Sequence, residues 1–141
     1  MWPDYLDNPQ AIYSAFPNAV PELKGLRPGR LVIDFAGDIL LGLEVQPLPD
    51  GGPSRWREKG NDGLEYRFMF YDTSDLSIFG MPQHLGPSVT LELDNGAASL
   101  FSQDRAFSAA FKFRGVRISL CAFSGARRVD LQDFWPPSWS R

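Results

Sequence analysis

Residues 30–48, RLVIDFAGDILLGLEVQPL, and residues 64–81, LEYRFMFYDTSDLSIFGM, decide the fold of this chain. In both stretches apolar residues recur at every second position, which is typical of β-strands with one buried face. The first stretch is interrupted at residues 36–38, AGD, and therefore predicts a hairpin of two strands. The second is interrupted at residues 72–75, DTSD, and predicts a second hairpin that ends in a short strand through residues 76–79.

The segment between these stretches, residues 49–63, reads PDGGPSRWREKGNDG and predicts a loop, because prolines and adjacent glycines oppose regular pairing. Gly51 and Gly52 are also typical of phosphate-binding loops, but the lysine and the strand-to-helix context of that motif are missing. We therefore expect a flexible connection here.

Further strands follow toward the C-terminus. Residues 88–103 contain Asn95-Gly96, which predicts a two-residue type I′ turn between two strands. Residues 106–113 and 116–123 alternate in the same way, and a last strand is expected through Val129 and Leu131. The residues expected to face inward are Val89, Leu91, Leu93, Phe107, Phe111, Phe113, Val116, Ile118 and Leu120.

One segment predicts a helix. Asn8 is a favourable N-cap, and Pro9 suits the first helical position because its missing N–H would have no partner there. Ile12, Tyr13 and Phe16 follow at helical spacing, and the next residue, a proline, ends the segment. We expect this short aromatic helix to cover the sheet.

The predicted fold is mainly β (α+β). It is an antiparallel meander of about eight or nine short strands, forming a curved sheet, a half-barrel or a two-layer sandwich, with one short N-terminal helix. The 141 residues suit a single domain, residues 1–141, with terminal arms at 1–7 and 132–141. We expect the C-terminal arm to pack through Trp135 and Trp139, because two exposed indoles would be an apolar liability.

The sequence predicts a cytoplasmic protein. Its N-terminal residues lack the pattern of a secretory signal, and no apolar run approaches the length of a membrane helix. The single cysteine, Cys121, excludes an internal disulfide and is expected to act as a small apolar residue. We therefore expect no membrane partner.

Charge is distributed unevenly along the chain. Residues 1–104 contain fifteen acidic and seven basic residues, whereas residues 105–141 contain two acidic and seven basic residues. Two readings are open: acidic and basic strands lie side by side and satisfy one another, or a polarised surface steers a charged protein partner.

No catalytic or metal-binding motif is recognisable. Cys121 and His84 are the chain's single cysteine and histidine, which is too few for a structural zinc site, and nothing in the sequence places them together. Asp72, Asp75 and Asp94 lie at turns, where aspartates usually accept backbone hydrogen bonds, and none follows calcium-loop spacing. We therefore expect no catalytic residues, no metal and no cofactor.

Basic and aromatic residues alternate at Phe111, Lys112, Phe113 and Arg114, as in some sheets that bind single-stranded nucleic acid. Strand periodicity places the phenylalanines opposite Lys112, however, so they are expected in the core rather than on a stacking surface. The isoelectric point of about 5.1 also argues against nucleic acid as a partner.

The block from Arg30 to Met81 resembles the immunity protein 50 family of bacterial polymorphic-toxin systems. The matching features are the aromatic helix NPQAIYSAFP, the strand pair LVIDFAGDILLGLEV, the segment PLPDGGPSRW before its tryptophan, and the strand pair that ends at FGM. FKFRGVRISLCAF fits the family's C-terminal half more loosely, and the similarity spans about residues 5–125. The family's pattern differs at Met81 and Pro82 and in the C-terminal tail.

The resemblance implies a non-enzymatic protein that binds a cognate toxin domain and blocks it. Acidic residues would suit a basic toxin such as a nuclease, and Trp56 with its arginine neighbours would suit an anchor, unless it folds back onto the sheet. The partner-binding candidates are Trp56, Arg57, Glu58, Asp62, Glu65, Asp72 and Asp75, with Glu92 and Asp94 as further acids. The alternatives are a β-barrel-like protein that binds a small apolar ligand, and an enzyme or scaffold subunit of unknown kind. Oligomeric state is left open.

Overall fold

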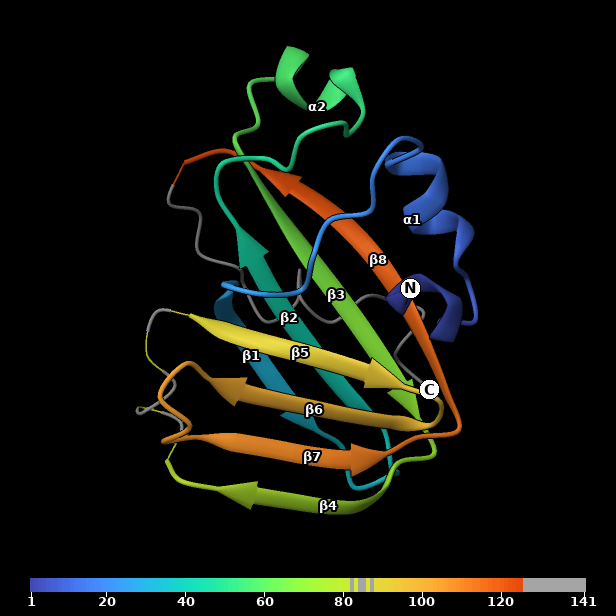
Figure 1. Ribbon diagram of the computed structural model, residues 1–141, viewed down its shortest axis with the longest axis vertical. Helices are drawn as coiled ribbons and strands as arrows, with labels where there is room; N and C mark the ends of the chain where they lie inside the picture. The colour runs from blue at the N-terminus through green and yellow to red at the C-terminus, as the bar shows by residue number, and fades with distance from the viewer. Residues whose placement is uncertain (82, 84–85, 87, 126–141) are drawn as a thin grey trace.

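Eight strands and three short helical segments follow one another in the computed structural model of the chain, which describes residues 1–81, 83, 86 and 88–125 (Figure 1). The N-terminal elements are η1 (Trp2–Tyr5), α1 (Gln10–Ala15), β1 (Arg27–Ile33), β2 (Ile39–Val45) and α2 (Ser54–Glu58). They are followed by β3 (Gly63–Tyr71), β4 (Ser74–Phe79), β5 (Val89–Asp94), β6 (Ala97–Ser102), β7 (Ser108–Lys112) and β8 (Gly115–Phe123).

The strands form two antiparallel sheets of four strands each, so the predicted mainly β fold is confirmed as a two-layer sandwich. The back sheet has the order β1-β2-β3-β8, and the front sheet has the order β4-β7-β6-β5. Figure 1 shows the front sheet crossing over the back sheet, with α1 beside β8 and α2 beyond one end of β3.

The core lies between the sheets and is strongly aromatic. The inward-facing residues of β3, which include Tyr66, Phe68 and Phe70, are fully buried, as the alternation predicts. Phe70 meets Phe111 of the front sheet edge to face, with ring centroids 4.9 Å apart. Such pairs contribute about 0.5–1.5 kcal/mol beyond the buried area. Trp2 of η1 closes one end of this core, 6.0 Å from the Phe68 ring.

N-terminal residues occupy one edge of each sheet. Residues 23–26 run along β5, where Leu26 and Val89 form an antiparallel bridge. At the edge of β8 the Asn8 side chain acts like a strand: its Nδ2 donates to the Ile118 carbonyl at 2.9 Å, and its Oδ1 accepts the Ile118 N–H at 3.0 Å. Within the described chain, β1 and β4 are left as the outer strands of the two sheets.

The predicted N-cap role of Asn8 is wrong. Its side chain is taken up by β8, α1 begins at Gln10 with Pro9 as the cap residue, and no side chain caps the helix. Residues 49–63 are also not entirely loop, because α2 forms one helical turn within them.

The predicted second hairpin is wrong as well. β3 already pairs with β2 on one side and with β8 on the other, so β4 crosses to the front sheet and pairs with β7. Asp72 and Asp75 adopt left-handed conformations, with φ of 48° and 53°, and this allows the chain to change sheets. Thr73 fixes the crossing by donating its N–H to the Gly37 carbonyl at 2.7 Å.

The first hairpin, β1 with β2, and the β5–β6 hairpin are confirmed. The turn between β5 and β6 differs in type from the prediction. Gly96 has a φ of 76°, but Asn95 does not share the positive φ that a type I′ turn needs at both positions. The expected strand through Val129 and Leu131 and the arm with Trp135 and Trp139 lie outside the described residues.

Among the described residues, no helix combines the length and the apolar character that crossing a membrane would require.

Candidate binding surfaces

Two of the predicted partner-binding residues, Glu65 and Trp56, are buried, and for Glu65 this corrects the expected exposure. Glu65 lies on the outer face of the back sheet, yet it is only 1% exposed, as is Leu40 on the same face. Arg67 Nε donates to Glu65 Oε1 at 2.5 Å, so this carboxylate is neutralised within the protein. Glu65 therefore belongs to the folded structure rather than to a binding surface, because loss of either member of this pair would leave an uncompensated buried charge.

Trp56 folds back into the core instead of standing free as an anchor. It is 9% exposed, and its ring meets Phe16 at 5.9 Å with an interplanar angle of 61°. Gly52 lies directly against the indole: a Cβ there would come within 2.8 Å of the ring. The alternative interpretation of this residue, packing onto the protein, is therefore the one that the structure shows.

The other predicted residues are exposed but lie in two separate places. Arg57, Glu58 and Asp62 precede β3, whereas Asp72 and Asp75 follow it (Figure 1). β3 has nine residues, so at about 3.3 Å per residue the two groups are about 30 Å apart. They do not form one surface.

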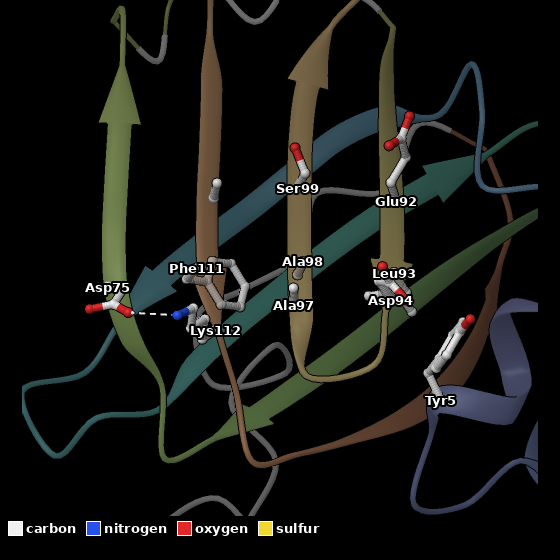
Figure 2. A pocket seen from close by; sticks show the side chains of 11 residues that line it. Tyr5, Asp75, Glu92, Leu93, Asp94, Ala97, Ala98, Ser99, Phe111 and Lys112 are labelled. Carbon is white, nitrogen blue, oxygen red and sulfur yellow. Dashed lines mark ion pairs between the residues drawn. The ribbon is translucent and has the colours of Figure 1, made fainter.

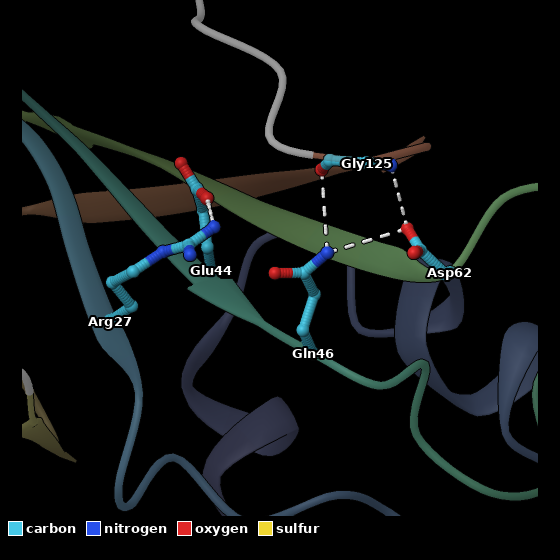
Figure 3. Close-up of polar contacts among 5 residues, drawn as sticks. All are labelled: Arg27, Glu44, Gln46, Asp62 and Gly125. Carbon is cyan, nitrogen blue, oxygen red and sulfur yellow. Dashed lines mark hydrogen bonds and ion pairs between the residues drawn. The ribbon is translucent and has the colours of Figure 1, made fainter.

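Asp62 has a structural role, which Figure 3 shows. Its Oδ1 accepts the Gly125 N–H at 3.0 Å and lies 3.4 Å from Gln46 Nε2, which also donates to the Gly125 carbonyl at 3.3 Å. These contacts tie the end of β8 across β3 to the end of β2. Beside them Arg27 of β1 forms an ion pair with Glu44 of β2.

Asp72 and Asp75 bring the acidic and the basic parts of the sequence together. Lys112 Nζ lies 3.3 Å from Asp75 Oδ2, and Arg114 lies 3.9 Å from Asp72. All four side chains are more than 60% exposed, so each pair contributes little to stability. The first reading of the charge distribution, acidic strands beside basic ones, therefore accounts for part of it.

The outer face of the front sheet carries a shallow hollow of about 570 Å³ (Figure 2). The register aligns four outward residues across the strands: Glu92, Ser99, Ala110 and Ser77. All of these side chains are small except that of Glu92 on β5. Small side chains on two central strands leave the hollow. It is lined by Tyr5, Asp75, Glu92, Leu93, Asp94, Ala97, Ala98, Ser99, Ala110, Phe111 and Lys112, and it is called the front hollow below.

The front hollow has an acidic rim. Glu92 and Asp94 stand on β5, and Asp75 stands on β4 next to Lys112 (Figure 2). Tyr5 of η1 closes the rim beyond β5 and is 38% exposed. With three carboxylates against one ammonium, the surface favours a cationic partner.

A second concavity, the edge groove, opens between the two sheets on the side of β1 and β4, with a volume of about 670 Å³. Its floor is formed by buried residues of both sheets, including Leu43, Leu100 and Phe107. Ile33 and Ile78, each 46% exposed, stand at its lips. The lining is Pro28, Gly29, Arg30, Leu31, Ile33, Leu41, Gly42, Leu43, Ile78, Gln83, Gly86, Leu100 and Phe107.

The described residues contain no group of three or more His, Cys, Asp or Glu side chains that could hold a metal ion. Cys121 is half-buried on β8, where its Sγ lies 3.9 Å from the Ala122 carbonyl oxygen. His84 lies outside the described residues.

Burial and hydrogen bonding shift the pKa values of Asp4, Tyr13, Tyr66 and Tyr71. Burial raises the pKa of Tyr66 far above its usual range, and burial also raises the pKa of Tyr71. At the surface, the Tyr13 hydroxyl donates to Asp4 Oδ1 at 2.6 Å, which lowers the pKa of Asp4 and raises that of Tyr13. This last contact joins η1 to α1.

Comparison of the chain with protein-family models, with curated proteins and with solved structures finds no match.

Sequence reasoning missed the small residues that shape the front hollow. Ala97, Ser99 and Ala110 occupy outward positions of β6 and β7, where polar or charged side chains are usual. These outward positions can be read from the segments AASLFS and SAAFK, because they alternate with the inward residues Leu100 and Phe111. Tyr5 carried no comparable signal, because its position depends on how η1 packs.

Proposed function

We infer that this chain is a non-enzymatic binding protein that neutralises a cognate toxin domain of a bacterial polymorphic-toxin system, acting in the cytoplasm of the producing cell. The resemblance of residues 5–125 to the immunity protein 50 family supports a toxin as the partner. The observation that carries a binding role is the front hollow, an exposed concave sheet face with an acidic rim.

The two outer sheet faces differ in a way that favours the front sheet. Leu40 and Glu65 are buried on the outer face of the back sheet, whereas Glu92, Asp94 and Lys112 are exposed on the front sheet. A sheet face held by three strand pairings changes little on association, which suits a preformed inhibitory surface.

The shape of the front hollow allows a partner to approach closely. Ser99 and Ala110 leave room above the central strands for protruding side chains of the partner. Tyr5 at the rim supplies an exposed aromatic ring of the type that is enriched among energetically dominant interface residues.

A typical interface covers about 800 Å² on each partner, which is more than the front hollow alone provides. The contact would therefore extend along the same sheet face toward Phe101. There the Arg105 guanidinium lies 3.9 Å from the centre of the Phe101 ring, and Phe79 is 66% exposed.

The charge of the rim supports a basic partner. Enzymes that act on nucleic acid bind phosphates through Lys and Arg side chains, so a nuclease toxin domain would present the complementary charge. Complementary charge mainly increases the association rate and the specificity of the complex.

The test is co-expression of this chain with the C-terminal domain of a large toxin encoded next to it, with growth and co-purification as readouts. The wild-type chain should restore growth and form a stable complex. The double variant Glu92→Lys/Asp94→Lys should weaken the complex by about tenfold or more, equivalent to about 1.4 kcal/mol.

The matched control is Asp50→Lys/Glu58→Lys, which makes the same charge change at two exposed side chains in the segment that precedes β3. This control should keep the affinity of the wild-type chain. If the control lost binding while the Glu92 and Asp94 variant kept it, the front hollow would be the wrong face. If the folded wild-type chain gave neither rescue nor a complex, the toxin-neutralising function itself would be rejected.

A further inference from the structure

We propose that Phe35, at the tip of the β1–β2 hairpin, is an anchor residue of the toxin interface and inserts into an apolar pocket of the partner. This role rests on the proposed function, because it names the contact that would fix a toxin domain beside the front hollow. Phe35 is singled out by its exposure, by the braced turn that presents it, and by the position of that turn next to the acidic rim.

Phe35 is the most exposed large apolar side chain of the described chain, at 110% of its reference area. None of its ring is removed from water when the chain folds, so it contributes nothing to the core. A covered aromatic ring buries about 150–250 Å² of surface, and covering apolar surface is favourable. That contribution is therefore left for a partner.

The turn under Phe35 is held in one conformation. The Gly37 N–H donates to the Asp34 carbonyl at 2.9 Å, and the Ala36 N–H donates to Asp34 Oδ1 at 3.0 Å. Thr73 ties the turn to the β3–β4 crossing, because its N–H and its Oγ1 both donate to the Gly37 carbonyl, each at 2.7 Å. A ring presented on a braced turn loses little conformational freedom on binding, which increases affinity.

The tip of the hairpin adjoins the acidic rim of the front hollow. Asp75 lies two residues after Thr73, so the rim begins about 7 Å along the chain from the contact with the turn. Three strand spacings of about 4.8 Å separate β4 from β5, which carries Glu92 and Asp94. The turn and the rim together span about 20 Å, which fits within one typical interface of about 800 Å² per partner. Because Phe35 is exposed on every side, a partner seated on the front sheet can reach it.

The charges near the tip indicate the kind of pocket that would receive the ring. Asp34 directly precedes Phe35, and Asp72 directly precedes Thr73. The Asp72 side chain is 66% exposed, and its ion pair with Arg114 is long, at 3.9 Å. Carboxylates next to an exposed ring favour an apolar pocket with lysine or arginine at its rim, which a basic toxin domain would supply.

The test measures the affinity of the full-length chain for the toxin domain used in the co-expression experiment. Phe35→Ser should weaken the complex by at least about thirtyfold, the loss that follows truncation of an energetically dominant interface residue. The matched control is Met81→Ser, which removes another exposed apolar side chain, 53% exposed, beyond the opposite end of β4 from Asp75. This control should bind like wild type. Both variants should keep the urea midpoint of wild type, because substitutions of exposed side chains change stability little.

The anchor and the toxin-neutralising function fail in different ways. Wild-type affinity in Phe35→Ser would overturn the anchor and leave the function standing. An equal loss of affinity in Met81→Ser would overturn the anchor as well, because the effect would not be specific to the tip. A lowered urea midpoint in Phe35→Ser would show that the ring supports the fold and is no anchor. If the folded wild-type chain formed no complex, the function and the anchor would both be rejected.

Discussion

Asn8 is the residue whose role is most specific to this fold. Its amide group makes both hydrogen bonds that a neighbouring strand would make to Ile118, at 2.9 and 3.0 Å. We expect Asn8→Ala to lower the free energy of unfolding by about 1–3 kcal/mol, because it leaves a backbone donor and acceptor without a protein partner. Urea denaturation measures this change.

The control for Asn8 is Asn18→Ala, since Asn18 is exposed in the loop after α1. Surface substitutions of this kind change stability by about 0.5 kcal/mol or less. Equal midpoints for the two variants would contradict a structural role for the Asn8 amide.

Tyr66 predicts how stability depends on alkaline pH. Its ring is fully buried, and burial raises the pKa of its hydroxyl in the folded chain above the value of about 10 in the unfolded chain. A raised folded-state pKa gives a contribution that is complete below about pH 10 and is lost as the pH rises above it. Stability should therefore fall above about pH 10, by up to about 1.4 kcal/mol per pH unit from this group.

Tyr66→Phe should retain the ring packing and remove this contribution. We expect the loss of stability between about pH 10 and 11 to be smaller in Tyr66→Phe than in wild type. Denaturant midpoints at a series of pH values measure the difference. Parallel profiles for the two chains would show that another group causes the alkaline loss.

At the scale of elements, Gly80 fixes how β4 ends. It has a φ of 85°, and a Cβ at this position would come within 2.1 Å of the Ala106 carbonyl oxygen. Gly37, in the turn between β1 and β2, has a φ of 94° but has no atom within 4 Å of such a Cβ. A side chain at Gly37 would therefore cause backbone strain alone, whereas a side chain at Gly80 would cause both backbone strain and steric overlap.

We expect Gly37→Ala to lower stability by about 1–2 kcal/mol, the cost of a left-handed conformation for an L-residue. Gly80→Ala should cost more, because the chain near Ala106 must move as well. Thermal unfolding of both variants measures this order. A smaller effect at Gly80 than at Gly37 would mean that the β4 end adjusts freely.

At the scale of the whole molecule, the uneven charge predicts how partner binding responds to salt. The association rate of the wild-type chain with a basic toxin domain should fall as ionic strength rises from 0.01 to 0.15 M, as the Debye length shortens from about 30 to 8 Å. Glu92→Lys/Asp94→Lys should flatten this dependence, whereas Asp50→Lys/Glu58→Lys should not. Stopped-flow mixing measures both, and equal slopes for the two variants would exclude steering by the front hollow.

The strands could be predicted from the sequence, because their alternating apolar residues depend only on which side faces the core. β5, β6 and β7 follow that pattern closely, whereas β2 and the first half of β3 are buried on both faces. The assignment of strands to sheets could not be predicted. The pairing of β4 with β7 depends on β3 having both edges occupied, which is a property of the assembled sandwich.

Of the candidate site, the sequence predicted the acidic character but not which of the named residues are exposed. Acidic residues such as Asp75 were identified, but Glu65 was expected at the surface and is buried, and for Trp56 the sequence left both an exposed anchor and packing onto the sheet open. Local sequence does not reveal that Phe16 would cover the indole of Trp56, or that Arg67 would neutralise Glu65. Both contacts come from tertiary packing that periodicity alone does not specify.

The pairing of Asn8 with Ile118 has a consequence for synthesis of the chain. The two residues are 110 positions apart, and the neighbouring Asp7 N–H donates to the Val116 carbonyl at 2.7 Å. A ribosome adds residues from the N-terminus at about 5–20 per second, so Asn8 waits several seconds before β8 exists. The back sheet therefore cannot be completed before β8 has left the exit tunnel, and only then can the N-terminal segment lock the sandwich.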